Sequence, residues 1–260
     1  MHILLLYIAR TSSSYIWQLF KGIKDVKIYG EIMNGPEKYL RPLGAKDKII
    51  DLQDDEDVSY HEFAKKKLPE YLKFLENSTK EPFYFTKVSL VHIFGLIKSK
   101  NPKLREILKD ENTKVIVLQR NLIDTYISLK KVGITNRWRE LDTTDLKIEI
   151  DNDDFLDYYE RMTMLYRNIF ELLGDKDYLL LSYEELHGNS GEKSDLEKVK
   201  YVIWRIKKEL GVKLELDKEH FTDLRLMFKQ DKNLHHSEKI TNYKSFLKFL
   251  EKNKLKFLID

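Results

Sequence analysis

The sequence predicts an α/β fold, in which one parallel sheet is covered by helices on both of its faces. Three runs of apolar residues indicate buried strands, because a strand covered on both faces is apolar along its whole length. These runs are residues 3–9, Lys114–Arg120 and Asp177–Tyr183. Segments with helical spacing of apolar residues separate them, and this alternation is typical of a parallel sheet with helical crossovers.

Length and composition favour one domain that spans residues 1–260. The chain is 42% apolar and 34% charged, with 10 Gly and 5 Pro, which excludes collagen-like, low-complexity and wholly disordered classes. It contains no cysteine, so disulfides, thiol nucleophiles and Cys-ligated metals are excluded. Its 46 basic and 43 acidic side chains nearly cancel, which argues against a nucleic-acid partner. An anion site must therefore come from local placement of charge.

The N-terminal half is expected to contain three strands. After the first strand, the Ser cluster supplies an N-cap for a helix that begins at Tyr15 and ends near Gly22. A loop-rich stretch covers residues 34–58. The remaining expected elements are strands at Val26–Tyr29 and Phe83–Val88, a helix between Tyr60 and Asn77, and a helix over Ile93–Leu108 interrupted near Pro102.

The C-terminal half is expected to be mainly helical around its two strands. Residues 133–154 are polar and acidic and suggest an excursion or lid. Adjacent His235 and His236 are interpreted as part of an exposed tail, not as a metal pair. The expected helices are Asn121–Lys131, Phe155–Leu173, Asp195–Leu210 and Tyr243–Phe257.

No targeting or membrane segment is expected. The apolar run at the N-terminus has about seven residues, which is too short to span a bilayer. Neither a basic region nor a small-residue cleavage site accompanies it. We therefore expect a soluble, cytoplasmic protein.

Polar residues follow the first strand at Arg10–Ser14, directly before a helix. Backbone N–H groups at a helix N-terminus and the helix dipole both favour a bound anion. Hydroxyls and one guanidinium add side-chain donors, so the segment indicates a P-loop-like phosphate loop without the Gly-Lys-Ser/Thr of the Walker motif. A Ser-rich helix cap is the alternative.

Two further strand ends carry polar residues, where open α/β sheets place their ligands. Arg120 ends a buried strand, and its planar fork suits phosphate oxygens; an ion pair with Asp124 is the alternative. Tyr183 ends another strand and could stack on a base, or simply pack at the edge of the core.

The three elements together, in this order, resemble the sulfotransferase family, which uses 3′-phosphoadenosine 5′-phosphosulfate as sulfuryl donor. The family commonly has a basic residue followed by Ser-Gly-Thr-Thr after its first strand. The matching residues, which here lack the Gly, are Arg10, Thr11, Ser12, Ser13 and Ser14, followed by the aromatic Tyr15. The resemblance implies that this loop holds the 5′-phosphosulfate.

The family's second element is Arg-Asn-Pro-x-Asp-x-x-x-Ser. Arg120, Asn121, Asp124 and Ser128 fit its spacing, with Leu122 in place of the Pro. The resemblance implies that Arg120 and Ser128 hold the 3′-phosphate. Tyr183–Leu186 matches a later Tyr-Glu-Asp/Glu-Leu segment, which implies that Tyr183 lies near adenine.

The C-terminal segment looks like the tail of bacterial carbohydrate-type sulfotransferases, on the residues Lys229-Gln230 and Lys239–Tyr243. Lys229 or Lys232 would then complete the 3′-phosphate pocket, with residues 221–260 closing the nucleotide site. The Arg-Lys-Gly element of cytosolic small-molecule sulfotransferases is absent, which weakens the case for a steroid or phenol substrate.

Sulfuryl transfer requires a base for the acceptor proton and charge stabilisation at the leaving oxygen, and the sequence requires no metal. Arg10 is the candidate for charge stabilisation. The candidate bases are Glu31, alternatively a solvated carboxylate, and His92, alternatively a core or helix-cap histidine. Lys87 could line the sulfate site or be an ordinary strand-end lysine.

The expected function is sulfuryl transfer to a hydroxyl or amine of a small molecule or glycan, with a carbohydrate or lipid-linked sugar among the acceptors considered. Two alternatives remain. One is a nucleotide or nucleoside kinase with a degenerate phosphate loop, and the other is a non-catalytic nucleotide-binding module.

Overall fold

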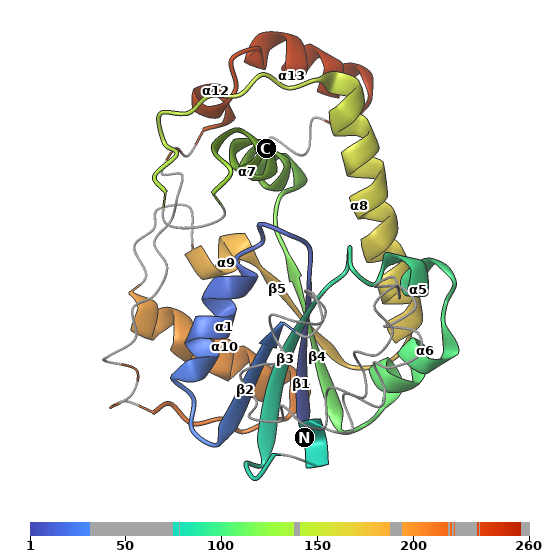
Figure 1. Ribbon diagram of the computed structural model, residues 1–260, viewed down its shortest axis with the longest axis vertical. Helices are drawn as coiled ribbons and strands as arrows, with labels where there is room; N and C mark the ends of the chain where they lie inside the picture. The colour runs from blue at the N-terminus through green and yellow to red at the C-terminus, as the bar shows by residue number, and fades with distance from the viewer. Residues whose placement is uncertain are drawn as a thin grey trace.

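The centre of the molecule is a five-stranded sheet in which every neighbouring pair of strands is parallel, in the order β2-β3-β1-β4-β5 (Figure 1). The strands are β1 (His2–Tyr7), β2 (Val26–Glu31), β3 (Phe83–Ser89), β4 (Thr113–Gln119) and β5 (Tyr178–Ser182). The computed structural model describes residues 1–31, 75–77, 79–137, 141–187, 194–217, 219, 221, 233 and 235–255.

Strand β1 lies in the middle of the sheet, and all six of its residues are buried. Because side chains alternate along a strand, Ile3 and Leu5 enter one hydrophobic cluster, while Leu4 and Leu6 enter the other. Burying each such side chain stabilises the fold by about 1.5–3 kcal/mol. The unbroken apolar run in the sequence is therefore explained by two covered faces.

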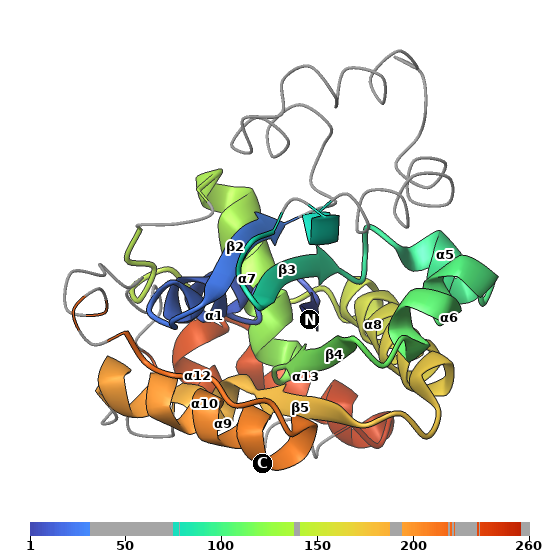
Figure 2. The ribbon, with the colours of Figure 1, turned by 90° about the horizontal axis from the view of Figure 1, so that it is seen from below.

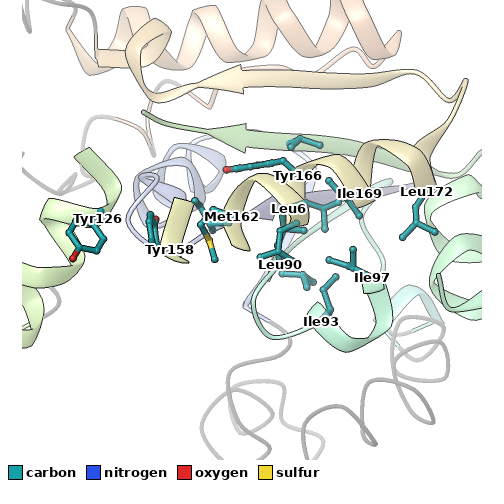
Figure 3. Close-up of a cluster of buried hydrophobic side chains, with 14 of the residues drawn as sticks. Leu6, Leu90, Ile93, Ile97, Tyr126, Tyr158, Met162, Tyr166, Ile169 and Leu172 are labelled. Carbon is teal, nitrogen blue, oxygen red and sulfur yellow. The ribbon is translucent and has the colours of Figure 1, made fainter. Parts of the chain in front are cut away.

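Helices cover both faces of the sheet, which confirms the predicted α/β class. One face packs against α1 (Ser13–Lys21) and α10 (Asp195–Leu210). The other packs against α5 (Phe94–Lys98), α6 (Pro102–Lys109) and α8 (Asn152–Leu173). Figure 2 shows these two groups of helices on opposite sides of the strands. Figure 3 shows Ile169 of α8 beside Leu6, Leu90 and Ile97.

Three helices lie beyond the carboxyl ends of the strands (Figure 1). Helix α7 (Leu122–Thr135) lies nearest to the sheet, and α12 (His236–Lys239) and α13 (Tyr243–Lys252) lie above it. Their attachment is specific: Ile148 and Ile240 form a parallel β-bridge, and the Asn242 side chain donates to the Ile150 carbonyl at 2.8 Å. The C-terminal segment is thereby joined to residues 148–150.

The free edge of the sheet at β5 is contacted by an arginine side chain. Strand β5 forms one edge, and Leu180 in it is 38% exposed. Arg205 of α10 reaches this edge, where its Nη2 donates to the Leu180 carbonyl at 2.9 Å. Its Nη1 donates to Glu185 at 2.9 Å and to the Tyr201 hydroxyl at 2.8 Å. One guanidinium therefore joins the edge strand to the neighbouring helices.

Several predicted boundaries differ from the observed ones. Helix α7 continues to Thr135, beyond the predicted end at Lys131, and α13 ends at Lys252, before the predicted Phe257. The predicted lid, residues 133–154, includes the end of α7 and the start of α8, and its segment 141–151 contains buried Ile148 and Ile150. The predicted loop over residues 34–58 and most of the helix predicted before Asn77 lie outside the described residues. Within the described residues, no helix is both long and apolar enough to cross a membrane.

Candidate functional site

Three strand ends with polar residues meet at one edge of the sheet. Tyr7 of β1 is in register with Leu118 of β4, which is in register with Leu181 of β5. The loop after β1, the residues after β4 and the short helix α9 (Tyr183–His187) after β5 therefore emerge side by side. This is where an open α/β sheet binds its ligands.

Two arginines and a serine from these segments are joined by hydrogen bonds. The Nε of Arg10 donates to the Ser128 hydroxyl at 2.8 Å. The Nη1 of Arg120 donates to the Arg10 carbonyl at 2.9 Å. The Arg120 guanidinium also lies 4.0 Å from the ring centre of Tyr183. The structure thus brings together Arg10, Arg120, Ser128 and Tyr183, as the sequence predicts.

The Nε of Arg120 is the most informative atom of the site. It is buried and has no hydrogen-bond partner among the described residues. A guanidinium stays charged in proteins, and an unsatisfied buried donor is costly. A phosphate oxygen would satisfy it, so the residues present fit a nucleotide phosphate at this position.

The loop Arg10–Ser14 adopts an unusual backbone. Arg10 and Ser12 have φ angles of 69° and 68°, in the left-handed region that favours glycine. Thr11 is fully buried, and its hydroxyl donates to the Ile8 carbonyl at 2.7 Å. Such strain is common where a loop approaches a ligand closely.

The expected Ser cap of α1 forms only in part. Ser12 occupies the N-cap position, and its carbonyl accepts from the Ile16 N–H at 3.1 Å. Its side chain makes no capping hydrogen bond with any described residue, because a left-handed cap residue does not aim its hydroxyl at the next turn. Ser13 is buried within α1, and Ser14 is half-buried.

Aromatic side chains form a wall beside the arginines. The ring centre of His187 lies 4.9 Å from that of Tyr15 and 4.3 Å from that of Tyr183. The Tyr15 hydroxyl donates to Asp195. Burial and this bond raise the pKa of Tyr15 well above its usual range. Sequence reasoning missed His187, although its position four residues after Tyr183 places both on one helical face.

Asp124 has different partners from those expected. It accepts a hydrogen bond from Lys239 Nζ at 2.6 Å, and His236 Nε2 lies 3.5 Å from the same oxygen. Arg120 is not among these direct partners and acts on Asp124 through its charge. The expectation of an exposed tail is wrong for His236, whose side chain is 10% exposed. Burial alone would raise the pKa of Asp124, but the contact with His236 and the charges of Arg120 and Lys239 hold it well below its usual range.

The two candidate bases lie at the β2–β3 side of the same edge. Glu31 is the last residue of β2, and its backbone is in register with Lys87 of β3. Lys87 is buried, with Nζ 5.3 Å from the Tyr7 ring centre. His92 lies in the turn after β3, where its backbone N–H donates to the Ser89 carbonyl at 3.0 Å. Lys229 and Lys232 lie outside the described residues.

A metal cluster is not seen within the described ranges, where no group of three or more His, Asp or Glu is arranged to hold an ion.

Comparison with known proteins gives structural neighbours only. No family model matches the sequence, and no curated protein matches it. A sulfotransferase from Alicyclobacillus acidocaldarius is similar at 13% identity and a TM-score of 0.44, over 98% of this chain and 94% of that chain. A retinol dehydratase in complex with androsterone and inactive cofactor PAP is similar at 12% identity and a TM-score of 0.35, over 99% of this chain and 79% of that chain. At this level of similarity, function has to be argued from the side chains.

Proposed function

We propose that this chain is a sulfotransferase, which transfers a sulfuryl group from 3′-phosphoadenosine 5′-phosphosulfate to a hydroxyl or amine of an acceptor. The observation that carries the proposal is the joined set Arg10, Arg120 and Ser128 with the unsatisfied Nε of Arg120. Two cations and a hydroxyl beside the N-terminus of α1 form an environment for more than one phosphate group.

The two phosphate positions follow from the two segments. The backbone N–H groups of the Arg10–Ser14 loop precede α1 and would hold the 5′-phosphosulfate. Arg120 and Ser128 would hold the 3′-phosphate, with Lys229 or Lys232 completing that pocket. Tyr183 would lie against adenine, because its ring face already binds a planar guanidinium.

The reaction needs little covalent chemistry from the protein. The donor, when bound, supplies the sulfuryl group: the acceptor oxygen forms the new S–O bond, and the bond to the bridging phosphate oxygen breaks. Arg10 would stabilise the negative charge that the bridging oxygen gains. A base would take the proton that the acceptor loses.

Glu31 is the first candidate for that base and His92 the second. Glu31 ends β2 and His92 follows β3, and these two strands are neighbours in the sheet. Buried Lys87, in register with Glu31, would line the sulfuryl position between them. The acceptor would be a carbohydrate or a lipid-linked sugar, with residues 133–154 as the lid over it.

Calorimetric titration tests the proposal directly. Adenosine 3′,5′-bisphosphate should bind with a micromolar Kd, and Arg120→Ala should abolish the binding. Arg105→Ala, a change at an exposed arginine of α6, is the matched control and should bind as the wild type does. Preference for ATP with magnesium would overturn the proposal in favour of a kinase.

Turnover separates an enzyme from a non-catalytic module. Transfer of ³⁵S from labelled donor to a panel of glycans and sugar lipids should be seen with the wild-type protein. Glu31→Gln should remove transfer while leaving the Kd of the bisphosphate within about twofold, since a base acts on the acceptor. Binding without transfer across the panel would identify a nucleotide-binding module.

A further inference from the structure

Asp124 occupies a special position in α7. It is four residues before Ser128, so the two side chains lie on one face of the helix, and it follows Arg120 by the same interval. The charge of Arg120 is close enough to lower the pKa of Asp124. Along the chain, a carboxylate therefore stands midway between the two residues that are candidates for the 3′-phosphate.

A carboxylate at this place requires a counter-charge, because it repels a phosphate dianion. An ammonium group and an imidazole ring of α12 face it: Lys239 Nζ lies at 2.6 Å and His236 Nε2 at 3.5 Å. The side chains of Lys239 and His236 are 7% and 10% exposed. Both therefore reach the face of α7 that carries Asp124 and Ser128 from the C-terminal segment.

The ion pair is not needed to attach α12. The Ile148 N–H donates to the Lys239 carbonyl at 3.0 Å, and the Thr241 N–H donates to the Ile148 carbonyl at 2.8 Å. A buried ion pair contributes little net stability, since both groups lose their hydration. What it does fix is the direction of the Lys239 and His236 side chains, which the backbone bonds leave free.

We propose that Asp124 is a positioning residue, whose carboxylate holds Lys239 and His236 against α7 so that α12 forms one wall of the 3′-phosphate site. This inference rests on the proposed function. It assigns the C-terminal wall to described residues that the sequence motifs did not single out as phosphate ligands.

One substitution distinguishes the positioning role from a purely electrostatic effect, because the two predict opposite changes in the Kd of the nucleotide. Asp124→Asn removes a negative charge from the neighbourhood of an anion site, so charge alone predicts tighter nucleotide binding. Loss of positioning predicts the reverse, because Lys239 and His236 would no longer be directed at the site. The expected result is a Kd for adenosine 3′,5′-bisphosphate that rises between about tenfold and a hundredfold.

The experiment measures the Kd of the bisphosphate and of adenosine 5′-phosphate for wild type, Asp124→Asn and Lys239→Gln. Both variants should weaken the bisphosphate and leave adenosine 5′-phosphate within about twofold, since only the first ligand has the 3′-phosphate. Glu171→Gln is the matched control: Glu171 of α8 also pairs with a lysine, Lys100 at 2.8 Å, and its substitution should leave both Kd values unchanged.

The outcomes are distinct. Wild-type protein that binds neither nucleotide overturns the proposed function. Wild-type binding with an equal or lower Kd for Asp124→Asn overturns the positioning role and leaves the function intact. Urea midpoints for the two single variants and the double variant test the ion pair without a ligand: non-additive shifts support it, and additive shifts overturn it.

Discussion

The loop Arg10–Ser14 and the turn Arg120–Asp124 are proposed to bind the two ends of one nucleotide, yet their local structures differ. The loop has two left-handed residues without glycine, and Ser12 makes no side-chain cap with a described residue. The turn begins with Asn121, whose side chain accepts from the N–H groups of Ile123 and Asp124. Local bonds therefore define the turn, whereas the loop depends on the strand and helix that it joins.

The proposed nucleotide site therefore combines a strained half, the loop Arg10–Ser14, with a relaxed half, the turn Arg120–Asp124. The relaxed half supplies an arginine fork that is already oriented by Arg10 and Tyr183. The strained half supplies backbone N–H groups whose direction depends on the rest of the fold. Substitutions in the two halves should consequently have effects of different size and sign.

The largest expected effect is on nucleotide binding, in the relaxed half. Arg120→Lys keeps the charge but loses the fork and the stacking on Tyr183, so the Kd of the bisphosphate should rise about a hundredfold, or about 2.7 kcal/mol. Arg10→Lys should raise it less than about tenfold, because Arg10 acts mainly through its charge. Calorimetric titration measures both Kd values, and equal increases would contradict the expected difference between the two halves of the site.

The next effect concerns the sheet on which the strained half depends. His2 at the start of β1 bonds with the Thr86 hydroxyl at 2.6 Å. Burial, the N-terminal ammonium and Lys176 lower its pKa from 6.5 to about 3. Between these values the unfolded chain binds the extra proton, so stability falls as the pH drops below 6.5, by about 2 kcal/mol at pH 5.

Thermal unfolding at pH 7 and pH 5 measures this loss. His2→Gln, which cannot titrate, should lose about 2 kcal/mol less than the wild type between the two pH values. The same dependence in both proteins would assign the acid sensitivity to other groups.

A smaller effect is expected at the cap of the relaxed half. Asn121→Ala removes both capping bonds and should lower stability by about 1 kcal/mol and weaken bisphosphate binding. Asn101→Ala removes the equivalent cap of α6, with a similar loss of stability. Chemical unfolding measures stability, and only the first variant should alter the Kd of the bisphosphate.

The smallest effect is expected in the strained half and has the opposite sign. Ser12→Gly relieves a left-handed serine and should raise stability by up to about 1 kcal/mol. Ser13→Gly, inside α1, should lower it by a comparable amount. Urea unfolding compares them, and a destabilised Ser12→Gly variant would show that the loop is not strained.

Local sequence patterns were sufficient to predict the central sheet and its covering helices. The apolar run that contains Ile3–Ile8 predicts a strand buried on both faces, and the structure confirms it. For residues 141–151 the polar composition was less informative than the pattern of apolar positions. Ile148 and Ile150 alternate with charged residues there, which is the pattern of a half-buried extended segment, and both are buried in the fold.

The resemblance grouped Arg10, Arg120, Ser128 and Tyr183, and in the structure these residues are in contact with one another. The remaining contacts depend on residues far apart in the chain. Asp124 and Lys239 are separated by 115 positions, and Tyr15 and Asp195 by 180. No local sequence pattern predicts such pairs, because the two side chains meet only when distant segments of the chain pack together.

Arg205 at the β5 edge has a consequence for how the protein behaves in concentrated solution. An outer strand offers unpaired backbone groups on which another chain can add a strand, and this is a common start of aggregation. At Leu180 the carbonyl is already bound by a guanidinium that also contacts Glu185 and Tyr201. The bond occupies an acceptor that an incoming strand would need. It therefore disfavours the addition of a strand from another chain at this edge of the sheet.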